Sequence, residues 1–348
     1  MGFFSNNNVK NIIIGENVRF LNNSMKNAFA NCGNFNKPIN IPRGITKAEY
    51  AFYNCANFNS KVFIPNTVQN FWYMFYGCTN FNTVPNVEDG IDSVAYLFMG
   101  CNKFNQPFEI PNSATNTRSL FESCGNFNRQ VNIPNGVIDV SSMFAGCSNF
   151  NQPINIPESV VKMYGMFNRC RNFNRPVNIH ANVEGDMGYA FANCNMFNQP
   201  VEIPQMVTST HAMFKNSSNF NQPVIIPNSV NTVYDMFCNC PSMNSPVYIS
   251  SNVTSLGNMF YNCPNMAGNI YLYSDKVTNV HNMLYKKNNS RRINIMIPST
   301  STNNYVNTLT ASGTYNSMFG TGDGFARNFN AVCVAYSQAR NVYIYRNL

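Results

Sequence analysis

A cysteine recurs every 23 residues along most of this chain, and this spacing constrains the fold more than any other feature of the sequence. The evenly spaced marker cysteines are Cys32, Cys55, Cys78, Cys101, Cys124, Cys147 and Cys170. Cys194 follows after 24 residues, and Ser217 takes the place of the next cysteine. Cys240 and Cys263 complete eleven marked units. A fixed period of this length is typical of a solenoid, because one short unit cannot bury its own apolar face, whereas stacked copies can.

The residues around each marker are nearly fixed. Phenylalanine stands three residues before every marker, from Phe29 to Phe260. Three residues after the marker stands phenylalanine in nine units, followed by Met243 and Met266 in the last two. Asparagine stands four residues after the marker in ten of the eleven units, and Ala267 is the exception. We expect these positions to stack on their own copies in successive units, one strand spacing apart.

One unit, residues 149–170, contains two periodicities. Ile154 and Ile156 alternate with Asn155, which predicts a short strand with both isoleucines facing inward and the asparagine facing outward. Pro157 ends this strand because it lacks a donor for the ladder. The apolar residues that follow are three or four apart, which predicts a short helix, partly 3₁₀. They are Val160, Met163, Met166, Phe167 and Cys170.

The limits of the repeat divide the chain into three parts. We predict an N-terminal cap at residues 1–27, with residues 12–14 as its first strand, and a solenoid at residues 28–273. Residues 274–348 are predicted to form degenerate repeats and a C-terminal cap, which a solenoid needs to cover the open end of its core. Alternating apolar residues predict one more strand at residues 293–297. Closing strands are expected around Val332, Val334, Val342 and Ile344.

The motifs of the repeat resemble those of a known family. A strand ending in IP, followed by a valine, AF or MF and xxC, resembles the BspA-like leucine-rich repeat. The segments AFANC, AFYNC and FNQPV are similar to the related repeat of mycoplasma surface proteins. The resemblance covers residues 28 to about 273 and implies an α/β fold, a right-handed leucine-rich-repeat solenoid of strand–helix units of about 23 residues. Such repeats occur in bacterial adhesins, protist surface proteins and phage proteins, so the resemblance implies binding rather than catalysis.

Composition narrows the class of partner. The net charge of +8 mildly favours anionic partners but is not by itself the footprint of a nucleic-acid-binding protein, and we expect no nucleic acid. No apolar run approaches the ~20 residues of a membrane span, so we expect no membrane insertion. Residues 1–20 contain neither a charged n-region nor a continuous apolar h-region, so we expect no signal peptide in this chain.

The cysteines admit a redox or metal-binding interpretation and a structural one. Ser217 at an equivalent position favours the structural one, because it indicates that the position requires a small side chain. Cys238 and Cys240 form a C-x-C pair without a second pair or a nearby histidine, so we expect no zinc and no cofactor. The histidines lie in separate units, at His180, His211 and His281. Since no carboxylate pair recurs either, we do not expect an enzyme.

The outward position of the strand varies, whereas the inward positions are nearly fixed. Through the stack it is occupied by Asn40, Phe63, Glu109, Asn132, Asn155, Asn178, Glu202, Ile225, Tyr248 and Tyr271. The last three are apolar or aromatic and are predicted to be adjacent, and Phe63 is the aromatic residue nearer the N-terminus. Exposed aromatic residues in a row indicate a protein interface or a sugar-stacking platform. Ordinary cross-strand stacking of strand-forming residues is the alternative.

A second variable position lies two residues before the strand. Its occupants form a neutral-to-basic ridge of hydrogen-bond donors, namely Lys37, Gln106, Arg129, Gln152, Arg175, Gln199 and Gln222. Arg129 and Arg175 are candidates for contact with a glycan or an acidic protein. A solvated edge is the alternative interpretation of the same ridge.

Together these features predict a non-enzymatic binding or structural solenoid. The predicted contact residues are Tyr248, Tyr271, Ile225, Phe63, Arg129 and Arg175. The expected partners are a protein, a cell-surface glycan or other subunits of a virion. We expect a phage virion component, such as a tail or receptor-binding protein, with a bacterial surface adhesin whose leader is absent from this chain as the alternative. A glycan-acting enzyme would require a pair of carboxylates in a cleft.

Overall fold

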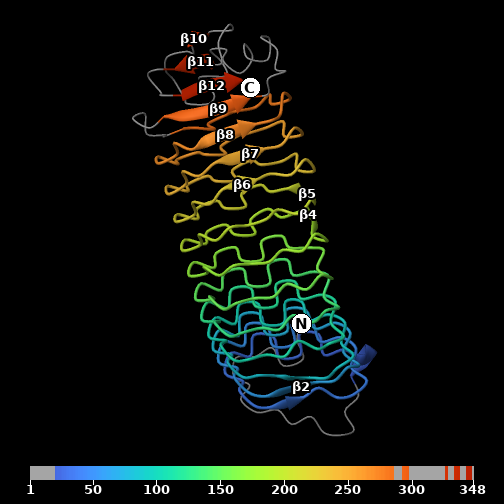
Figure 1. The fold of residues 1–348 in the computed structure, drawn as a ribbon. Helices are drawn as coiled ribbons and strands as arrows, with labels where there is room; N and C mark the ends of the chain where they lie inside the picture. Colours follow the sequence, from blue (N-terminus) through green and yellow to red (C-terminus); the bar gives the residue numbers. More distant parts are fainter. Residues whose placement is uncertain (1–19, 286–291, 298–325, 328–332, 338–341, 347–348) are drawn as a thin grey trace. The chain divides into compact units, whose positions relative to one another are not determined.

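The computed structural model describes residues 20–285, 292–297, 326–327, 333–337 and 342–346. The chain forms two compact units, Met1–Arg175 (unit 1) and Pro176–Leu348 (unit 2), and each is described by itself. Within each unit the chain winds in successive coils of about 23 residues that stack on one another (Figure 1). Each unit is therefore a β-solenoid. The strand predicted at residues 12–14 lies outside the described residues.

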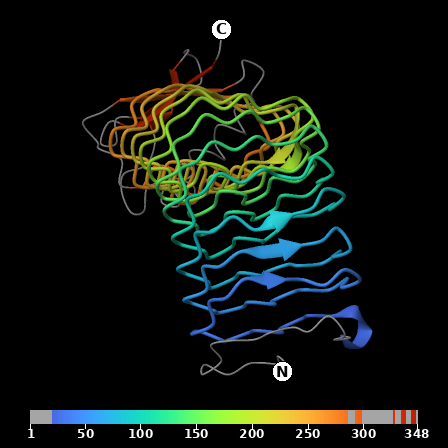
Figure 2. The ribbon, with the colours of Figure 1, turned by 90° about the horizontal axis from the view of Figure 1, so that it is seen from below.

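Unit 1 contains a three-stranded parallel sheet with one short strand per coil. Its strands are β1 (Ile39–Asn40), β2 (Val62–Ile64) and β3 (Asn86–Val87), in that order. The register aligns Asn40 with Phe63 and Phe63 with Asn86, so that equivalent positions of successive coils lie side by side. Figure 2 shows the three arrows next to one another. A short 3₁₀ segment, η1 (Leu21–Asn23), precedes the first of these strands.

Unit 2 contains a two-stranded and a seven-stranded sheet. The smaller one pairs β4 (Glu184–Asp186) with β5 (Met206–Ser209) in parallel. The larger one has the order β10-β11-β12-β9-β8-β7-β6. Its strands are β6 (Val224–Ile225), β7 (Val247–Ile249), β8 (Asn269–Leu272), β9 (Ile293–Ile297), β10 (Ala326–Arg327), β11 (Cys333–Ser337) and β12 (Val342–Arg346).

The strand directions differ between the two ends of the larger sheet. Strands β6 to β9 and β12 are parallel, whereas β11 runs antiparallel to β12 and β10 runs antiparallel to β11. The strand predicted at residues 293–297 is β9. Val334 lies in β11, Val342 and Ile344 lie in β12, and Val332 is outside the described residues. The assignment of residues 274–348 as a cap stays a prediction.

The core of each unit is built from two columns of phenylalanine rings, three residues before and three residues after the marker. In unit 1 the ring centroid of Phe144 lies 4.2 Å from that of Phe150 in its own coil. It lies 5.8 Å and 5.9 Å from the centroids of Phe121 and Phe167 in the neighbouring coils. All four side chains are fully buried. Offset stacking of this kind adds to the burial of apolar area, so the repeated phenylalanine is explained by its contact with its own copies.

The predicted strand–helix unit is wrong in its second half, because no α-helix occurs in the described residues. The apolar residues from Val160 to Cys170 do face the core, as predicted, but they lie in a series of tight turns. Each of the eleven marked units has two residues with positive φ, four positions apart, such as Asn27 and Asn31 with φ of 57° and 64°. A right-handed helix cannot contain such residues, so the three-to-four spacing here arises from turns.

The hydrogen bonds of these turns explain why the segment does not become a helix. The amide of Ala30 donates to the carbonyl of Asn27 at 3.1 Å, within the coil. The amide of Phe29 instead donates to the carbonyl of Ala51 in the next coil, at 2.7 Å. Because alternate amides bind the neighbouring coil, they cannot also close the i to i−4 bonds of a helix. Stacking of the coils therefore supplies the bonds that a helix would have made internally.

The residue directly before each marker shows the same constraint in the sequence. It has positive φ in every marked unit and is asparagine in six and glycine in three, Gly77, Gly100 and Gly146. Both residue types adopt the left-handed conformation more readily than others. Ser123 and Arg169 are the two exceptions. The asparagine or glycine before the cysteine was thus the sequence signal that excluded a helix.

The strand predicted at residues 154–156 is confirmed in its burial pattern but not in its backbone pairing. Ile154 and Ile156 are buried and Asn155 is exposed. No strand is present at residues 154–156, whereas the equivalent residues of β1 and β2 pair with each other. Alternation thus specified the direction of each side chain without specifying a regular ladder in every coil.

A column of asparagine side chains joins the coils on one side. The Asn151 amide nitrogen of the backbone donates to Oδ1 of Asn128 at 2.9 Å, and the Asn174 amide donates to Oδ1 of Asn151 at 3.0 Å. In unit 2 the series ends where the amide of Ala267 donates to Oδ1 of Asn244 at 2.8 Å. The last position needs only a backbone donor to complete the bond, which explains why alanine is found there.

Candidate functional site

Five of the outward positions predicted from the sequence lie in strands, and their side chains are exposed or half-buried; these are Asn40, Phe63, Ile225, Tyr248 and Tyr271. In unit 2, Ile225 pairs with Tyr248, Tyr248 with Tyr271 and Tyr271 with Met296. We call these four residues the apolar strip. The sequence pattern identified the first three members. Met296 was missed, although its place between the buried Ile295 and Ile297 marks it as outward.

The apolar strip presents ring edges and aliphatic groups to solvent. Ile225 is 68% exposed, and Tyr248, Tyr271 and Met296 are half-buried. The rings of Tyr248 and Tyr271 stack with centroids 4.5 Å apart and planes 5° from parallel. Because each ring covers a face of the other, their shared faces are closed to a ligand. The strip is therefore suited to contact with another apolar surface more than to a sugar ring stacked on an open aromatic face.

Polar side chains border the apolar strip. Nδ2 of Asn269 donates to the hydroxyl of Tyr271 at 3.3 Å, and Nδ2 of Asn294 donates to Oδ1 of Asn269 at 2.9 Å. Nε of Arg292 donates to Oδ1 of Asn294, also at 2.9 Å. An apolar centre with a polar border is the arrangement found in protein interfaces.

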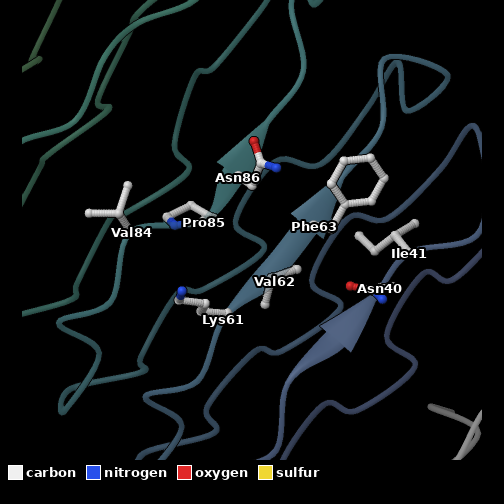
Figure 3. Close-up of a pocket in the computed structure, with 8 residues that line it drawn as sticks. All are labelled: Asn40, Ile41, Lys61, Val62, Phe63, Val84, Pro85 and Asn86. Carbon is white, nitrogen blue, oxygen red and sulfur yellow. The ribbon is translucent and has the colours of Figure 1, made fainter.

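A second feature is a pocket on the outward face of the unit 1 sheet. Its volume is about 730 Å³, and it is lined by Asn40, Ile41, Lys61, Val62, Phe63, Val84, Pro85 and Asn86. Figure 3 shows the ring of Phe63 near Asn86 and Ile41, with Lys61 and Val84 toward the other end of the pocket. Asn86 was missed by the sequence analysis, although it occupies the outward position between Phe63 and Glu109 in the 23-residue count.

Arg43 and Glu88 form an ion pair next to the ring of Phe63. The guanidinium carbon of Arg43 lies 5.8 Å from the centroid of the Phe63 ring. The same guanidinium binds both carboxylate oxygens of Glu88, at 2.5 Å and 3.2 Å. The pKa of Glu88 is lowered, first by the hydrogen bond from the backbone amide of Asn66 and then by that from Arg43. The charge of Arg43 is thus compensated by a carboxylate that stays ionised.

The two candidate arginines of the ridge lie apart from Phe63. Nε of Arg129 donates to the carbonyl of Asn105, and Nε of Arg175 donates to the carbonyl of Asn151, each at 3.0 Å. The coil of Gln152 separates them, and three coil repeats separate Arg129 from the coil of Phe63. Each therefore clamps its own coil to the preceding one. Their role in binding stays a prediction.

The marker cysteines have a structural role that the sequence only partly indicated. In most coils the marker thiol donates to the carbonyl of a phenylalanine 26 residues earlier, as Sγ of Cys147 does to Phe121 at 3.0 Å. Oγ of Ser217 makes the same bond to the carbonyl of Phe191 at 2.6 Å. Burial raises the pKa of Cys55 and that of Cys263 to about 12. These thiols are hydrogen-bond donors in the core and do not have the character of nucleophiles.

His211 lies near a serine hydroxyl and a carboxylate, the groups that accompany histidine in a catalytic triad. Its Nδ1 lies 2.9 Å from Oγ of Ser209 and 3.3 Å from Oδ1 of Asp186. In a catalytic triad the carboxylate and the hydroxyl meet opposite nitrogens of the ring, whereas here they share one. This geometry does not activate the serine. Within the described residues, no three or more His, Cys, Asp or Glu side chains are grouped so that they could hold a metal ion.

The comparison with family profiles decides the relationship that the repeats suggested. The family described as "Mycoplasma protein of unknown function, DUF285" matches residues 23–133, 92–203, 115–226 and 186–300. These matches overlap and span most of the chain. The protein belongs to the DUF285 family. The resemblance to the mycoplasma-type repeat is thus confirmed, and the overlapping matches reflect the 23-residue period.

Two solved structures are similar to this DUF285 protein. A leucine-rich repeat protein from Bacteroides ovatus ATCC 8483 is 15% identical, with a TM-score of 0.54 over 75% of this chain and 76% of that one. A leucine rich cell surface protein from Faecalibacterium prausnitzii A2-165 is 20% identical, with a TM-score of 0.44 over 82% of this chain and 86% of that one. The first likeness supports the leucine-rich-repeat type of fold. No curated protein matches the chain.

The described part of the chain contains no helix with the length and apolar character needed to cross a bilayer.

Proposed function

We propose that this DUF285 protein is a non-enzymatic binding protein and that the apolar strip of unit 2 contacts a protein partner. The observation that carries the proposal is the alignment of Ile225, Tyr248, Tyr271 and Met296 on one outward sheet face. The inward residues of the solenoid form its core, so folding does not require a further row of apolar residues on the outward face. Exposed apolar rows with a polar border are typical of interaction sites.

The geometry of the strip favours a protein over a glycan at this face. Because the two tyrosine rings stack on each other, a ligand can reach their edges but not the faces that they share. Ile225 adds an exposed aliphatic side chain to the strip. Tyrosines at the centre of an interface commonly carry a large share of the binding free energy. Tyr248 and Tyr271 are therefore the residues on which we expect the affinity to depend.

The test compares the purified chain with a Tyr248→Ala/Tyr271→Ala variant for binding to intact host-type cells and to protein and glycan arrays. Loss of both rings is expected to weaken binding to a protein ligand by about 30-fold or more, since truncation of a single interface hot spot costs ~2 kcal/mol or more and the costs of neighbouring residues do not add fully. Tyr234→Ala is the matched control, because Tyr234 is also exposed, at 46%, but lies in a turn segment. Binding by none of the three proteins would contradict the proposal.

We further propose that this contact is made in a phage particle, by a tail or receptor-binding component. The resemblance to adhesin-type repeats supports a receptor-binding role, and a bacterial surface adhesin is the alternative location. Mass spectrometry of purified particles separates the two, because a virion component copurifies with the particles at constant stoichiometry. Accessibility of the protein to protease on intact bacterial cells, with none in particles, would favour the adhesin.

A further inference from the structure

The pocket of unit 1 contains a single charged residue among its eight lining residues, Lys61. Lys61 is exposed, and its ammonium group makes no ion pair or hydrogen bond with any described residue. The nearby Arg43 is bound to both oxygens of Glu88, so its charge is already compensated. The pocket therefore carries one positive charge that is available to a ligand.

Phe63 has asparagine neighbours in the sheet, whereas the two tyrosines of the apolar strip stack on each other. Its register neighbours are Asn40 and Asn86, whose side chains are exposed amides. In the described structure no second aromatic ring lies against Phe63, and the guanidinium of Arg43 lies over its ring. The part of the ring that lines the pocket is thus open to a ligand, with amide donors and acceptors on both sides.

The wall opposite this ring is apolar. Val84 is 39% exposed and, with Pro85, lines the pocket beside Lys61. In most other coils proline occupies the position of Lys61 and Val84, as at Pro107 and Pro153. The charge and the aliphatic wall are therefore particular to these two coils, and the repeat itself does not require them.

We propose that this pocket binds a sugar residue that carries a carboxylate. The ring of Phe63 offers a surface for the C–H face of a pyranose, Asn40 and Asn86 offer hydrogen bonds to its hydroxyl groups, and the ammonium of Lys61 binds the carboxylate. The volume of about 730 Å³ suits a small ligand, since such sites occupy about 300–1,000 Å³. This site lies on a different unit from the apolar strip, so it goes beyond the protein contact proposed above.

The single charge of Lys61 favours an acidic sugar over a neutral sugar or a phosphate group. A neutral sugar would leave the ammonium without a partner, and a phosphate group would favour several backbone or cationic donors, whereas this pocket holds one cation. Because the ion pair forms at an exposed site, its contribution is expected to weaken as salt is added.

The experiment titrates the full chain by calorimetry with three probes: sialyllactose, a glucuronic-acid-containing oligosaccharide and lactose. The wild-type protein is expected to bind one or both acidic probes more tightly than lactose. Lys61→Gln is expected to reduce the affinity for the acidic probe by about tenfold or more, since a hydrogen bond to a charged group contributes about that factor. Phe63→Ala is expected to abolish detectable binding.

Matched controls exclude a general loss of folding or charge. Lys103→Gln removes an exposed charge from the same unit without touching the pocket, and Ile138→Ala removes an apolar side chain that is 45% exposed there. Both are expected to bind like the wild type. The Tyr248→Ala/Tyr271→Ala variant should retain sugar binding, which keeps failure of this proposal distinct from failure of the protein contact.

Three results would overturn the inference. They are the absence of acidic-sugar binding by the wild-type protein, equal binding of an acidic sugar by Lys61→Gln and the wild type, and binding of poly-glutamate as tight as that of the acidic sugars. The last would show that the pocket responds to negative charge in general, including acidic peptides. Retention of the thermal unfolding midpoint by Phe63→Ala confirms that any loss of binding is local, as its half-exposed position predicts.

Discussion

The marker position requires a small side chain that can donate a hydrogen bond into the preceding coil. Cys147 donates to the carbonyl of Phe121, and Ser217 makes the equivalent bond in unit 2. The accepting carbonyls lie beside fully buried phenylalanine rings, where an unsatisfied oxygen is costly. Cysteine and serine, which share a small size and a hydrogen-bond donor, therefore occupy the same column.

Substitutions at Cys147 separate size from hydrogen bonding. Cys147→Ser should keep the bond to Phe121 and lower the free energy of unfolding by at most about 1 kcal/mol. Cys147→Ala should lower it by about 1–3 kcal/mol, because the carbonyl loses its partner. Urea denaturation of the three proteins measures the difference. Equal stability of the alanine and serine variants would show that size alone matters at this position.

The buried thiols also predict how stability depends on pH. Burial raises the pKa of Cys55 from 9.0 to about 12 in the folded protein. Below pH 9 the thiol is protonated in both states, so its contribution to stability is fully present. Above that pH the unfolded chain loses the proton first, and the free energy of unfolding therefore falls as the pH rises towards about 12.

Urea denaturation at about pH 8 and about pH 10.5 tests this dependence. The wild-type midpoint should be lower at the higher pH. In Cys55→Ser the fall should be smaller, since the hydroxyl does not titrate in this range and its bond to the carbonyl of Phe29 is retained. An identical fall in both proteins would show that titration of Cys55 does not contribute to the alkaline loss of stability.

At the scale of the elements, the position before each marker decides between a helix and a pair of turns. Gly146 has a φ of +76°, and a Cβ there would lie 3.2 Å from Cα of Ser123. Arg169 occupies the same position in the next coil with a φ of 65°. Glycine adopts positive φ without strain, so Gly146 suits its conformation. Arg169 does not, and it is kept in this conformation by the fold around it.

Two substitutions at this position should have opposite effects. Gly146→Ala is expected to lower the free energy of unfolding by about 1–2 kcal/mol or more, from the left-handed conformation and the close contact. Arg169→Asn should raise it by up to about 1 kcal/mol, since asparagine tolerates positive φ. Thermal and urea unfolding of both variants measure the changes. A stabilised Gly146→Ala protein would contradict the proposed turn geometry.

Sequence periodicity predicted which residues face the core better than it predicted the backbone that carries them. Met163, Met166 and Phe167 are fully buried, as their spacing indicated, because turns and a helix both bring residues three or four apart to one side. The asparagine or glycine before most marker cysteines distinguishes the two, because both residue types adopt positive φ more readily than others. The pocket at Phe63 was not predicted, because it depends on how side chains from three successive coils lie together, among them Lys61 and Asn86.

At the scale of the whole molecule, equal spacing of the coils matters more than the number of coils. Each column, whether of phenylalanine, cysteine or asparagine, joins a residue to its copy in the next coil, as Asn128 is joined to Asn151. In such a stack each coil contacts its neighbours only, so stability is close to a sum of coil and interface terms. Removal of one complete coil should therefore leave the remaining columns in register.

Deletion of residues 129–151 from unit 1 tests this property. It joins Asn128 to Gln152 and restores the 23-residue spacing between Cys124 and Cys170. We expect this protein to fold with a circular dichroism spectrum like that of the full chain and a modestly lower unfolding midpoint. Deletion of residues 129–140, about half as long, breaks the spacing. It should disrupt unit 1 although it removes less of the chain, because it leaves apolar positions opposite polar ones. If the shorter deletion were the better tolerated, register between coils would not be what holds the unit together.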